Sequence, residues 1–301
     1  MKTTEIVVIG AGIAGITAAI YLKRSNVDFV ILEGDKIGGL LNILKSVENY
    51  PAMPNSNGQE IISSLSRQMF ELGIKTTSGY VQTILKDSDG FEVKTEFDIY
   101  KCKAVIVATG LSQNKQTIPG EEKYIGMGVS YCATCDGNFF KNQDVAVIGN
   151  NDIALEESLY LMNLVSKIYL INPDKQLNGN LEIIKQLSNS NKVVILNNKK
   201  VESIDGDDFG ITSIKVDGKS IPVSGVFPYI GKKTSTQILN NLKPDMNGIY
   251  VKTDEINQSN IPGLFIAGDL RDKKLRQLVT AASDGAISAT VAFQYIKGVS
   301  K

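Results

Sequence analysis

The sequence predicts an α/β protein with two doubly wound, three-layer modules, each built around a parallel sheet. The first observation is a short apolar run, Glu5 to Ile9, which leads through a glycine-rich turn into a helical pattern ending near Arg24. The second is that the same order returns in Val145 to Ile148, a second turn and a helix ending near Leu164. The length of 301 residues suits roughly two domains.

The composition limits the possible functions. Acidic and basic residues balance to a net charge of zero, which gives no general case for binding nucleic acid or a membrane. Three cysteines are too few for a disulfide framework and indicate a reducing compartment, so we expect a cytoplasmic protein. The chain has no histidine, which excludes Ser-His-Asp and Cys-His catalysis and leaves proton transfer to carboxylate, cysteine, lysine, tyrosine or water.

The uncharged run from Ile6 to Leu22 is expected to be a buried strand that turns into a helix. Glu5 precedes the run and three glycines interrupt it, which is unlike a signal peptide. The run is also too short and too rich in glycine for a membrane span.

The turn itself reads Gly10-Ala11-Gly12-Ile13-Ala14-Gly15, the spacing of a dinucleotide-binding fingerprint. The first glycine makes the turn, the second lets the backbone approach a pyrophosphate, and the third lets the helix pack on the strand. Val27 to Leu32 is the expected next strand, and Glu33 at its end is placed to accept ribose hydroxyls. Because a carboxylate would repel a free phosphate, this module suits FAD or NAD rather than NADP.

The chain up to residue 110 continues this first module. The expected elements are a break at Gly38-Gly39, a loop at Val47 to Pro51, a helix from Ile61 to Leu72, short antiparallel strands between Val81 and Tyr100, and a buried strand from Ala104 to Ala108 closed by Thr109-Gly110. Cys102 lies just before that last strand, and we interpret it as a small buried residue because no other cysteine is near it in sequence.

Residues Tyr131 to Gly137 read Tyr-Cys-Ala-Thr-Cys-Asp-Gly and form the expected reactive centre. Cys132 and Cys135 can cycle between dithiol and disulfide. Zinc requires four nitrogen or sulfur ligands, which three cysteines without a histidine cannot supply, so redox chemistry is favoured and no metal is expected. If Cys135 opens a helix, the helix amides and dipole favour its thiolate. The adjacent Asp136 is the candidate for proton transfer.

The second turn, Gly149 to Ala154, is a degraded copy of the first. Asn151 replaces the second glycine, the one that admits pyrophosphate. The next expected strand, Lys167 to Ile171, ends in Asn172-Pro173-Asp174. Short strands and turns continue to Gly231.

The last part of the chain resembles a return to the first module. Strands are expected at Ile249 to Val251 and Leu264 to Ala267, and Gly268-Asp269 follows the second of them. Gln277 to Ile296 is the expected closing helix, and Gly298 ends it.

Together these residues resemble the low-molecular-weight thioredoxin reductase family. The resemblance covers nearly the whole chain and rests on the fingerprint at Gly10 to Gly15, on Cys132 to Gly137, and on Gly268-Asp269 with Arg276-Gln277 and Ala281 to Ala286 behind it. It implies an FAD-binding domain in residues 1–112 and 244–301 and a degenerate NAD(P)H-type domain in residues 113–243. The implied fold has two Rossmann-like dinucleotide-binding domains, the second inserted into the first. The family also implies a homodimer and a rotation between the domains.

The resemblance assigns roles to single residues. Cys135 is expected to face the flavin, Cys132 to exchange with a protein disulfide, and Asp136 to act as general acid and base. The implied FAD-binding residues are Gly10, Gly12, Ala14, Gly15, Glu33, Gly38, Gly39, Asn49, Ala108, Thr109, Gly110, Gly268, Asp269, Arg276, Gln277 and Leu278. Of these, Asp269 is expected at the ribityl chain, and the last three beside the flavin ring.

One departure from the family concerns the reductant. Members that use NADPH carry an intact glycine loop in the second module, and a His-Arg-Arg run with a further arginine that holds the 2′-phosphate. Here those positions read Asn150-Asn151 and Asn172-Pro173-Asp174, and no arginine lies between Gln113 and Lys243. Guanidinium recognition of phosphate is therefore absent from that module. The pattern resembles the ferredoxin-dependent flavin thioredoxin reductases, so we expect reduced ferredoxin as donor and thioredoxin as substrate.

Other interpretations stay open at this point. An NADH- or NADPH-dependent reductase is one, since Asp174 could accept a ribose hydroxyl. Another protein disulfide or a small disulfide could be the substrate, and a non-catalytic FAD-binding redox sensor is a candidate of a different class. For an acidic ferredoxin, the candidate docking residues are Lys232-Lys233 and the segment Arg271 to Arg276, which includes Lys273 and Lys274.

Overall fold

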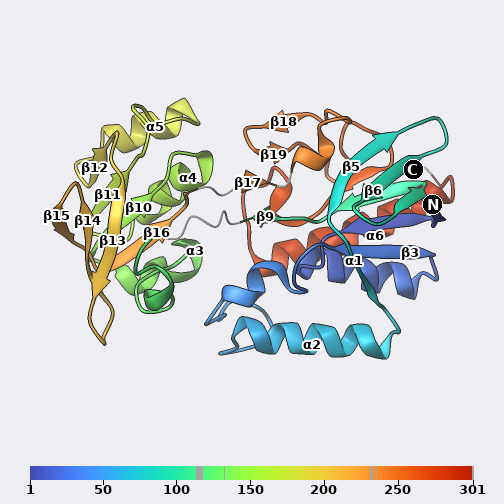
Figure 1. Ribbon diagram of the computed structural model, residues 1–301, viewed down its shortest axis with the longest axis horizontal. Coiled ribbons are helices and arrows are strands. Elements are labelled where there is room, and N and C mark those ends of the chain that lie inside the picture. The colour runs from blue at the N-terminus through green and yellow to red at the C-terminus, as the bar shows by residue number, and fades with distance from the viewer. Residues whose placement is uncertain (113–117, 132, 231–232, 235, 300–301) are drawn as a thin grey trace. The chain divides into compact units, whose positions relative to one another are not determined.

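The computed structural model describes residues 1–112, 118–131, 133–230, 233–234 and 236–299 (Figure 1). The chain divides into two compact units. Unit 1 contains residues 1–112 and 233–301, and unit 2 contains residues 113–232. Unit 2 is therefore inserted into unit 1 along the chain, as the sequence predicted.

The second boundary between the units differs from the predicted one at residue 243. The short 3₁₀ helix η4 (Thr236–Leu239) follows the return of the chain to unit 1. Its Ile238 and Leu239 are buried in the same apolar cluster as Val7 and Ile84 of unit 1. Burial of these two side chains fixes residues 233–243 to the first unit, a tertiary contact that the local sequence does not reveal.

Unit 1 is built on a five-stranded parallel sheet. Its order is β20 (Leu264–Ile266), β8 (Ala104–Val107), β2 (Ile6–Ile9), β3 (Phe29–Glu33) and β4 (Thr76–Ser78). All residues of β2, β8 and β20 are buried, which explains why these strands read as continuous apolar runs.

Two different layers cover the two faces of this sheet. Alternate residues Ile6 and Val8 of β2 pack in one cluster with the helices α1 (Ile13–Arg24), α2 (Gly58–Glu71) and α6 (Leu278–Ile296). The residues between them, such as Val7, belong to a second cluster that includes antiparallel strands. This alternation follows from the two-residue period of a strand and gives unit 1 its three layers.

A second, four-stranded sheet of unit 1 is largely antiparallel, and its strands are short. The four-stranded sheet has the order β1 (Lys2–Thr3), β7 (Ile99–Cys102), β6 (Phe91–Thr95) and β5 (Val81–Lys86). The remaining elements of unit 1 are η1 (Gly39–Ile43), the pair β9 (Leu111–Ser112) and β17 (Lys233–Thr234), the hairpin β18 (Met246–Asn247) and β19 (Tyr250–Val251), and η5 (Gly268–Leu270).

Helix α2 has a clear start signal in its sequence. Asn57 is the N-cap, and its side chain accepts a hydrogen bond from the backbone nitrogen of Glu60 at 3.0 Å. The Glu60 carboxylate in turn accepts from the backbone nitrogen of Asn57 at 2.9 Å. This capping box places the helix start at Gly58, three residues before the predicted Ile61.

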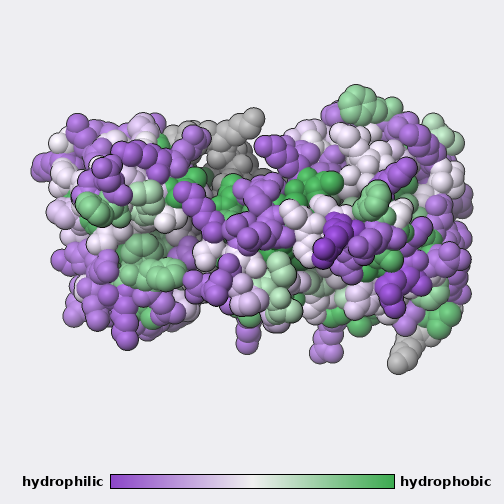
Figure 2. Space-filling model, turned by 90° about the horizontal axis from the view of Figure 1, so that it is seen from below, coloured by the Kyte–Doolittle hydropathy of each residue, from purple (hydrophilic) through white to green (hydrophobic). Residues whose placement is uncertain are grey.

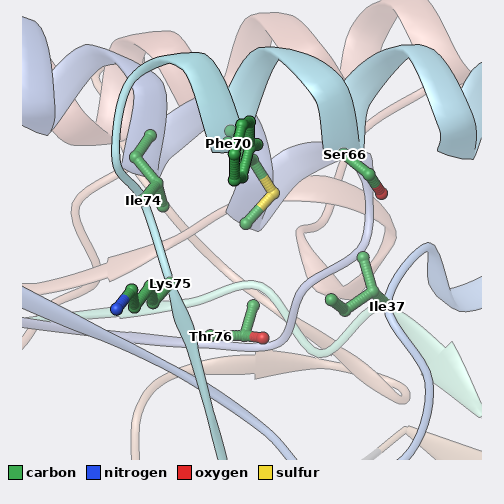
Figure 3. A pocket seen from close by; sticks show the side chains of 7 residues that line it. Ile37, Ser66, Phe70, Ile74, Lys75 and Thr76 are labelled. Carbon is green, nitrogen blue, oxygen red and sulfur yellow. The ribbon is translucent and has the colours of Figure 1, made fainter.

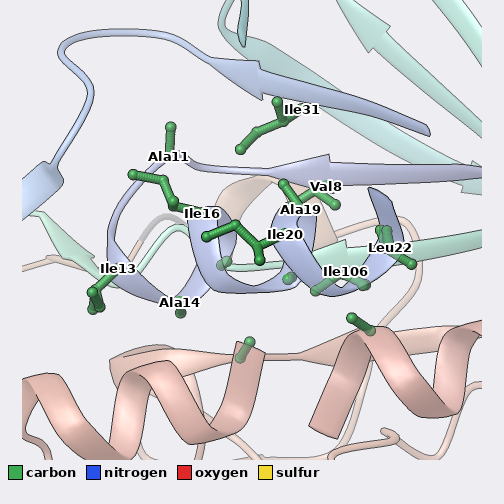
Figure 4. Packing of buried hydrophobic residues seen from close by; sticks show 14 of the residues in the cluster. Val8, Ala11, Ile13, Ala14, Ile16, Ala19, Ile20, Leu22, Ile31 and Ile106 are labelled. Carbon is green, nitrogen blue, oxygen red and sulfur yellow. The ribbon is translucent and has the colours of Figure 1, made fainter. Parts of the chain in front are cut away.

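Helices α1 and α6 lie side by side beneath the parallel sheet (Figure 4). The close approach occurs at Gly285, where an added Cβ would lie 2.2 Å from the backbone oxygen of Ala14. Both helices bury small residues, alanine and glycine in α1 and alanine, glycine and serine in α6, so their backbones can approach closely.

Unit 2 combines a parallel and an antiparallel sheet. The parallel sheet has the order β12 (Val193–Leu196), β11 (Lys167–Ile171), β10 (Asp144–Ile148) and β16 (Gly225–Pro228). The antiparallel sheet is formed by β13 (Val201–Gly206), β14 (Ile211–Val216) and β15 (Lys219–Pro222). Its other elements are η2 (Glu122–Tyr124), α3 (Ala133–Asp136), η3 (Gly137–Phe140), α4 (Asp152–Leu161) and α5 (Leu181–Ser188).

The surface carries both hydrophilic and apolar residues. Figure 2 shows one face of the molecule, on which hydrophilic residues predominate and apolar residues form small separate areas. Within the residues that the structure describes, no helix is both long enough and apolar enough to cross a membrane.

We expect Gly285→Val to destabilise unit 1, because the new side chain collides with the backbone of α1 and cannot relax by rotation. The cost should be about 1–3 kcal/mol of unfolding free energy, as for other overpacked sites. Urea denaturation followed by circular dichroism measures it. The control is Ser283→Val, which adds a β-branched side chain at an exposed position of the same helix. Equal stability of both variants would show that the helix crossing is not tightly packed.

Candidate functional site

Most of the predicted FAD-binding residues of unit 1 lie at one edge of its parallel sheet. The turn at Gly10 follows β2, Glu33 ends β3, Thr109-Gly110 follows β8, and Gly268-Asp269 follows β20. Because these four strands are parallel neighbours, their carboxyl ends meet at the same edge. In open α/β sheets this edge is where ligands bind.

The three glycines of the first turn have different surroundings. A Cβ on Gly10 would lie 2.5 Å from the backbone oxygen of Ala108, and one on Gly15 would lie 1.8 Å from the backbone oxygen of Gly10. The fold itself therefore requires these two glycines. A Cβ on Gly12 meets nothing within 4 Å, and its φ of −77° is open to any residue. Gly12 is not required by packing, and space is open in front of it.

The start of α1 is also open to a ligand. Gly12 is its N-cap and provides no side chain to accept from the first amides. Uncapped amides at a helix start, with the helix dipole behind them, form a site for an anion such as pyrophosphate. Glu33 lies beside this turn, since its carboxylate accepts a hydrogen bond from the backbone nitrogen of Ala11 at 2.6 Å.

Gly38 and Gly39 join the same turn. The backbone nitrogen of Gly38 donates to the backbone oxygen of Ala11 at 2.8 Å. A Cβ on Gly39 would lie 3.5 Å from the Cα of Gly12. Both glycines have positive φ angles, 102° and 53°, which a side chain would strain. The structure thus brings the two glycine-rich segments together, although Gly38 lies 28 positions after Gly10 in the sequence (38 − 10).

Thr109 and Gly110 add a polar group at the end of β8. Gly110 has a φ of 59°, so the chain turns sharply there. The hydroxyl oxygen of Thr109 is buried and has no hydrogen-bond partner within the described part of the chain. A buried hydroxyl normally has a partner, so this one is available to a polar group of a ligand.

The segment expected beside the flavin ring is held together by side-chain contacts. The amide nitrogen of Asn49 donates to the side-chain oxygen of Gln277 at 2.9 Å. The guanidinium of Arg276 lies 3.5 Å from the centre of the Tyr250 ring, and it donates to the backbone oxygen of Asp269 at 3.3 Å. Leu278 begins helix α6 directly after these residues.

One predicted role in this region is wrong. Lys273 was a candidate for docking an acidic ferredoxin, but its side chain is 9% exposed and its ammonium lies 2.7 Å from the buried carboxylate of Asp284. Arg271 pairs with the same carboxylate at 3.0 Å. Asp284 also accepts from the backbone nitrogen of Gly268 at 3.1 Å, so this cluster positions the Gly268-Asp269 turn. Lys274 remains exposed.

The other docking candidates, Lys232 and the side chain of Lys233, lie outside the described residues. Cys102 fits its predicted structural role, since it is a free and buried cysteine. Burial raises the pKa of its thiol to about 12, so the reactive thiolate is scarce at neutral pH.

The redox motif lies at the start of unit 2. Cys132 and the side chain of Cys135 lie outside the described residues. Helix α3 begins at Ala133, so Cys135 lies inside this short helix and does not open it. Asp136 ends this helix, and its carboxylate accepts a hydrogen bond from the hydroxyl of Ser130 at 2.6 Å.

Two further carboxylates hold the segment around the motif. The hydroxyl of Tyr131 donates to the buried Glu121 at 2.7 Å. The backbone nitrogen of Ala133 donates to Glu157 of α4 at 2.6 Å. The hydroxyl of Tyr229 donates to the same Glu157 oxygen at 3.2 Å. Tyr229 is fully buried, and burial raises its pKa, with the nearby negative charge of Glu157 as the next cause.

The start of α4 is capped by a side chain, whereas the start of α1 is not. Asn151 is the N-cap of α4, and its side-chain oxygen accepts from the backbone nitrogen of Ala154 at 2.9 Å. Its amide nitrogen donates to the backbone oxygen of Tyr229 at 2.9 Å. The side chain that replaces the second glycine therefore occupies the start of α4 and satisfies one of the amides that a pyrophosphate would otherwise use.

The loop after β11 fills the same turn from the other side. The amide nitrogen of Asn150 donates to Asp174 at 2.8 Å, and its oxygen accepts from the backbone nitrogen of Asn178 at 2.6 Å. Asp152 accepts from the backbone nitrogen of Asn180 at 3.0 Å. Asp174 and its neighbours thus bind the protein's own turn, at the position where other dinucleotide folds bind ribose.

A protein-family model described as pyridine nucleotide-disulphide oxidoreductase matches residues 4–285. The chain belongs to this family. A thioredoxin reductase from Listeria innocua is 35% identical over 98% of this chain and 95% of the relative. A solved thioredoxin reductase from Streptococcus pyogenes is 33% identical, with a TM-score of 0.84 over 98% of this chain and 99% of that one. A ferredoxin-flavin thioredoxin reductase from Clostridium acetobutylicum is 26% identical, with a TM-score of 0.57 over 99% of both chains.

Within the family, the chain is a thioredoxin reductase-like flavin disulfide oxidoreductase with FAD as its cofactor. Unit 1 fits this cofactor on three observations. Space is open at Gly12, the amides at the start of α1 are uncapped, and the buried hydroxyl of Thr109 lacks a protein partner in the described residues.

Sequence reasoning missed Glu157, Tyr229 and Asp284. The first two meet the redox segment only through the fold, because they lie in α4 and directly after β16. Asp284 carried a weak signal, as an acidic residue within a run of small apolar ones in a closing helix. A buried charge requires a partner, and Asp284 pairs with both Lys273 and Arg271.

We expect Gly12→Val to weaken FAD binding without unfolding the protein. The backbone angles tolerate a side chain and no protein atom opposes it, so the apoprotein should lose less than about 0.5 kcal/mol of stability. The new side chain would stand at the open helix start and lower FAD affinity at least about tenfold, or 1.4 kcal/mol. Flavin fluorescence titration of the apoprotein measures this. Gly15→Val is the contrast, since it collides with Gly10 and should unfold the unit; unchanged FAD affinity in the Gly12 variant would place the pyrophosphate elsewhere.

Proposed function

We propose that this protein reduces thioredoxin through FAD and a Cys132–Cys135 redox disulfide, with reduced ferredoxin rather than NADPH as electron donor. The main evidence for this donor is the turn between β10 and α4 in unit 2. There the side chain of Asn151 caps α4 and occupies the position where a nucleotide pyrophosphate would bind. The nucleotide turn of unit 1, which has the same strand-turn-helix form, is open at Gly12.

The chemistry of the proposed reaction follows from the residue types. Bound FAD supplies a carrier that links one-electron donors to the two-electron reduction of a disulfide. Cys132, as a thiolate, attacks the thioredoxin disulfide and forms a mixed disulfide, and one thioredoxin sulfur leaves as a thiolate that takes up a proton. Cys135 then attacks the Cys132 sulfur, which releases reduced thioredoxin and restores the internal disulfide. Asp136 is the proposed group that supplies and accepts protons, and Ser130 orients its carboxylate.

Charge recognition supports a donor other than NADPH. Nucleotide sites for NADPH commonly hold the 2′-phosphate with guanidinium groups, and residues 113–243 contain no arginine. Asp174 adds a negative charge beside Asn150 in the same turn. A phosphate placed there would meet repulsion from a carboxylate and no bidentate partner.

The energetics also suit ferredoxin. A ferredoxin near −400 mV lies about 130 mV below thioredoxin near −270 mV, which is roughly 6 kcal/mol for two electrons. The solved ferredoxin-flavin thioredoxin reductase of Clostridium acetobutylicum shares 26% identity with this chain. With three cysteines and no histidine in the sequence, we propose a reducing, cytoplasmic setting for the reaction.

An NADH-dependent reductase is the second candidate, and Asp174 is the residue that would favour it, by accepting ribose hydroxyls. Its carboxylate already accepts from Asn150 at 2.8 Å, and the segment Asp174 to Asn180 is bonded to the turn. NADH binding would have to displace these contacts and the Asn151 cap.

We also propose a homodimer formed through helix α2. A shallow groove of about 350 Å³ runs between α2 and the segment that leads into β4 (Figure 3). Its lining residues are Ile37, Ser66, Met69, Phe70, Ile74, Lys75 and Thr76. Phe70 is 84% exposed beside this apolar groove, and a second copy of the chain would bury it. The resemblance to a dimeric family supports this choice of partner.

An anaerobic titration of the holoprotein tests the donor. With thioredoxin present, we expect reduced ferredoxin to bleach the flavin absorbance and to reduce thioredoxin, and we expect NADPH and NADH to do neither. The control is Cys132→Ser, in which ferredoxin should still bleach the flavin while thioredoxin stays oxidised. Prompt bleaching by NADPH would contradict the assigned donor, and thioredoxin reduction by the Cys132 variant would contradict the assigned disulfide.

Phe70→Asp tests the dimer. A charge in the centre of the proposed contact should weaken self-association at least about tenfold, because it would be buried without a partner. Sedimentation velocity over a range of protein concentrations measures the change. Phe209→Asp is the matched control, since Phe209 is 96% exposed on the β13–β14 turn of unit 2. A dimer that survives Phe70→Asp would remove α2 from the interface.

A further inference from the structure

The guanidinium of Arg276 is held against an aromatic ring. Its central carbon lies 3.5 Å from the centre of the Tyr250 ring, well inside the ~6 Å range of a cation–π contact. Tyr250 is 3% exposed, so water does not screen this contact. The same guanidinium donates to the backbone oxygens of Asp269 and Arg271 at 3.3 and 3.4 Å. These distances are long for hydrogen bonds, so the ring contributes much of the placement of the positive charge.

The fold holds the Tyr250 ring in place. Tyr250 lies in β19, which pairs with β18 in a tight hairpin, and the next residue, Val251, is fully buried. The backbone oxygen of Val251 accepts from the backbone nitrogen of Asp272 at 2.9 Å. The hairpin is therefore bonded to the segment that leads to Arg276, and the ring has little freedom to move away from the guanidinium.

The order of the strands indicates which half of the cofactor lies near Arg276. The pyrophosphate is expected at Gly12, after β2, and Glu33, at the end of β3, is placed to accept the ribose of the adenosine half. Strands β8 and β20 lie on the opposite side of β2 from β3, so the flavin half extends towards β20. Arg276 is bonded to Asp269, which follows β20, and its charge therefore lies on the flavin side of the site.

We propose that Tyr250 is a positioning residue that holds the Arg276 cation beside the flavin and thereby raises the reduction potential of FAD. Reduction of bound FAD by two reduced ferredoxins adds two electrons and one proton, oxidises both ferredoxins, and leaves one negative charge on the flavin ring. A guanidinium is charged at every pH of interest, so a fixed one stabilises this product by charge attraction. The inference rests on the proposed function and on the expected place of Arg276 beside the flavin ring.

Tyr250→Leu removes the ring and keeps an apolar side chain in the core. All proteins in this test, the parent included, carry Cys132→Ser and Cys135→Ser, so that the flavin is the group that takes up electrons. The holoproteins are reduced anaerobically at pH 7 with dithionite beside a dye of known potential, and the flavin absorbance is recorded. We expect Tyr250→Leu to shift the equilibrium constant about tenfold towards oxidised FAD, which is about 30 mV for two electrons. Tyr250→Phe keeps the ring face and should stay within about twofold of the parent.

A double-mutant cycle separates positioning from packing. Arg276→Gln should also lower the potential, and Tyr250→Leu should then add less than about twofold. A tyrosine that only filled the core would shift the potential equally with and without Arg276. Tyr21→Leu, at a 46% exposed position of α1, is the control for the type of substitution and should leave the potential within about twofold of the parent.

Arg276→Lys decides the question if the Tyr250→Leu variant does not fold. Lysine keeps the charge but has no planar group to lie on the ring, so we expect a smaller shift in the same direction. The parent's potential in Tyr250→Leu, or in Arg276→Lys where that variant decides, would overturn the role of Tyr250. The parent's potential in Arg276→Gln would remove Arg276 from the flavin, and the inference with it. A failure of the proposed electron donor is seen separately, as bleaching of the unaltered protein by NADPH.

Discussion

The packing of unit 1 depends on two close backbone contacts of helix α1, one with the turn before it and one with helix α6. Gly15 allows α1 to lie directly against the backbone of Gly10, and Gly285 allows α6 to lie against the backbone of α1. These contacts bury the strands and helices in one apolar cluster. They also set the position of the carboxyl edge of the sheet, where Glu33 and Gly268-Asp269 converge. The cofactor-binding edge is thus a consequence of backbone packing at two glycines.

Units 1 and 2 contain the same strand-turn-helix, but the N-cap residue of the helix differs between them. In unit 1 the N-cap position is Gly12, which leaves the helix amides open. In unit 2 the N-cap position is Asn151, whose side chain bonds both the helix and the end of β16. A capping side chain stabilises a helix by about 1 kcal/mol, and the same atoms exclude an anion from that site. A glycine at the N-cap thus leaves the helix start open, whereas an asparagine there occupies it and stabilises the helix.

The sequence was enough to predict the features that depend on local order. The glycine spacing at Gly10 to Gly15 and the buried strands have local signatures, and the structure places them as expected. Features that depend on distant partners were not predictable. Lys273 reads as a surface lysine until Asp284, on the next helix, is found beside it. Ile238 and Leu239 likewise assign their segment to unit 1 only through burial against its core. In both cases one tertiary contact outweighs the local pattern.

The same limit applies to the segment around the redox motif, because some of its contacts come from distant parts of the chain. The spacing of its two cysteines was evident from the sequence. Glu157 was not, because it reaches the backbone of Ala133 from α4 and is itself bonded by Tyr229 from the end of β16. Tyr229 also accepts, through its backbone oxygen, the side-chain bond of Asn151. One residue therefore connects the closed nucleotide turn with the carboxylate at the redox helix. The cap of α4 and the hydrogen bond to Glu157 therefore depend on one residue, and a change at Tyr229 would disturb both.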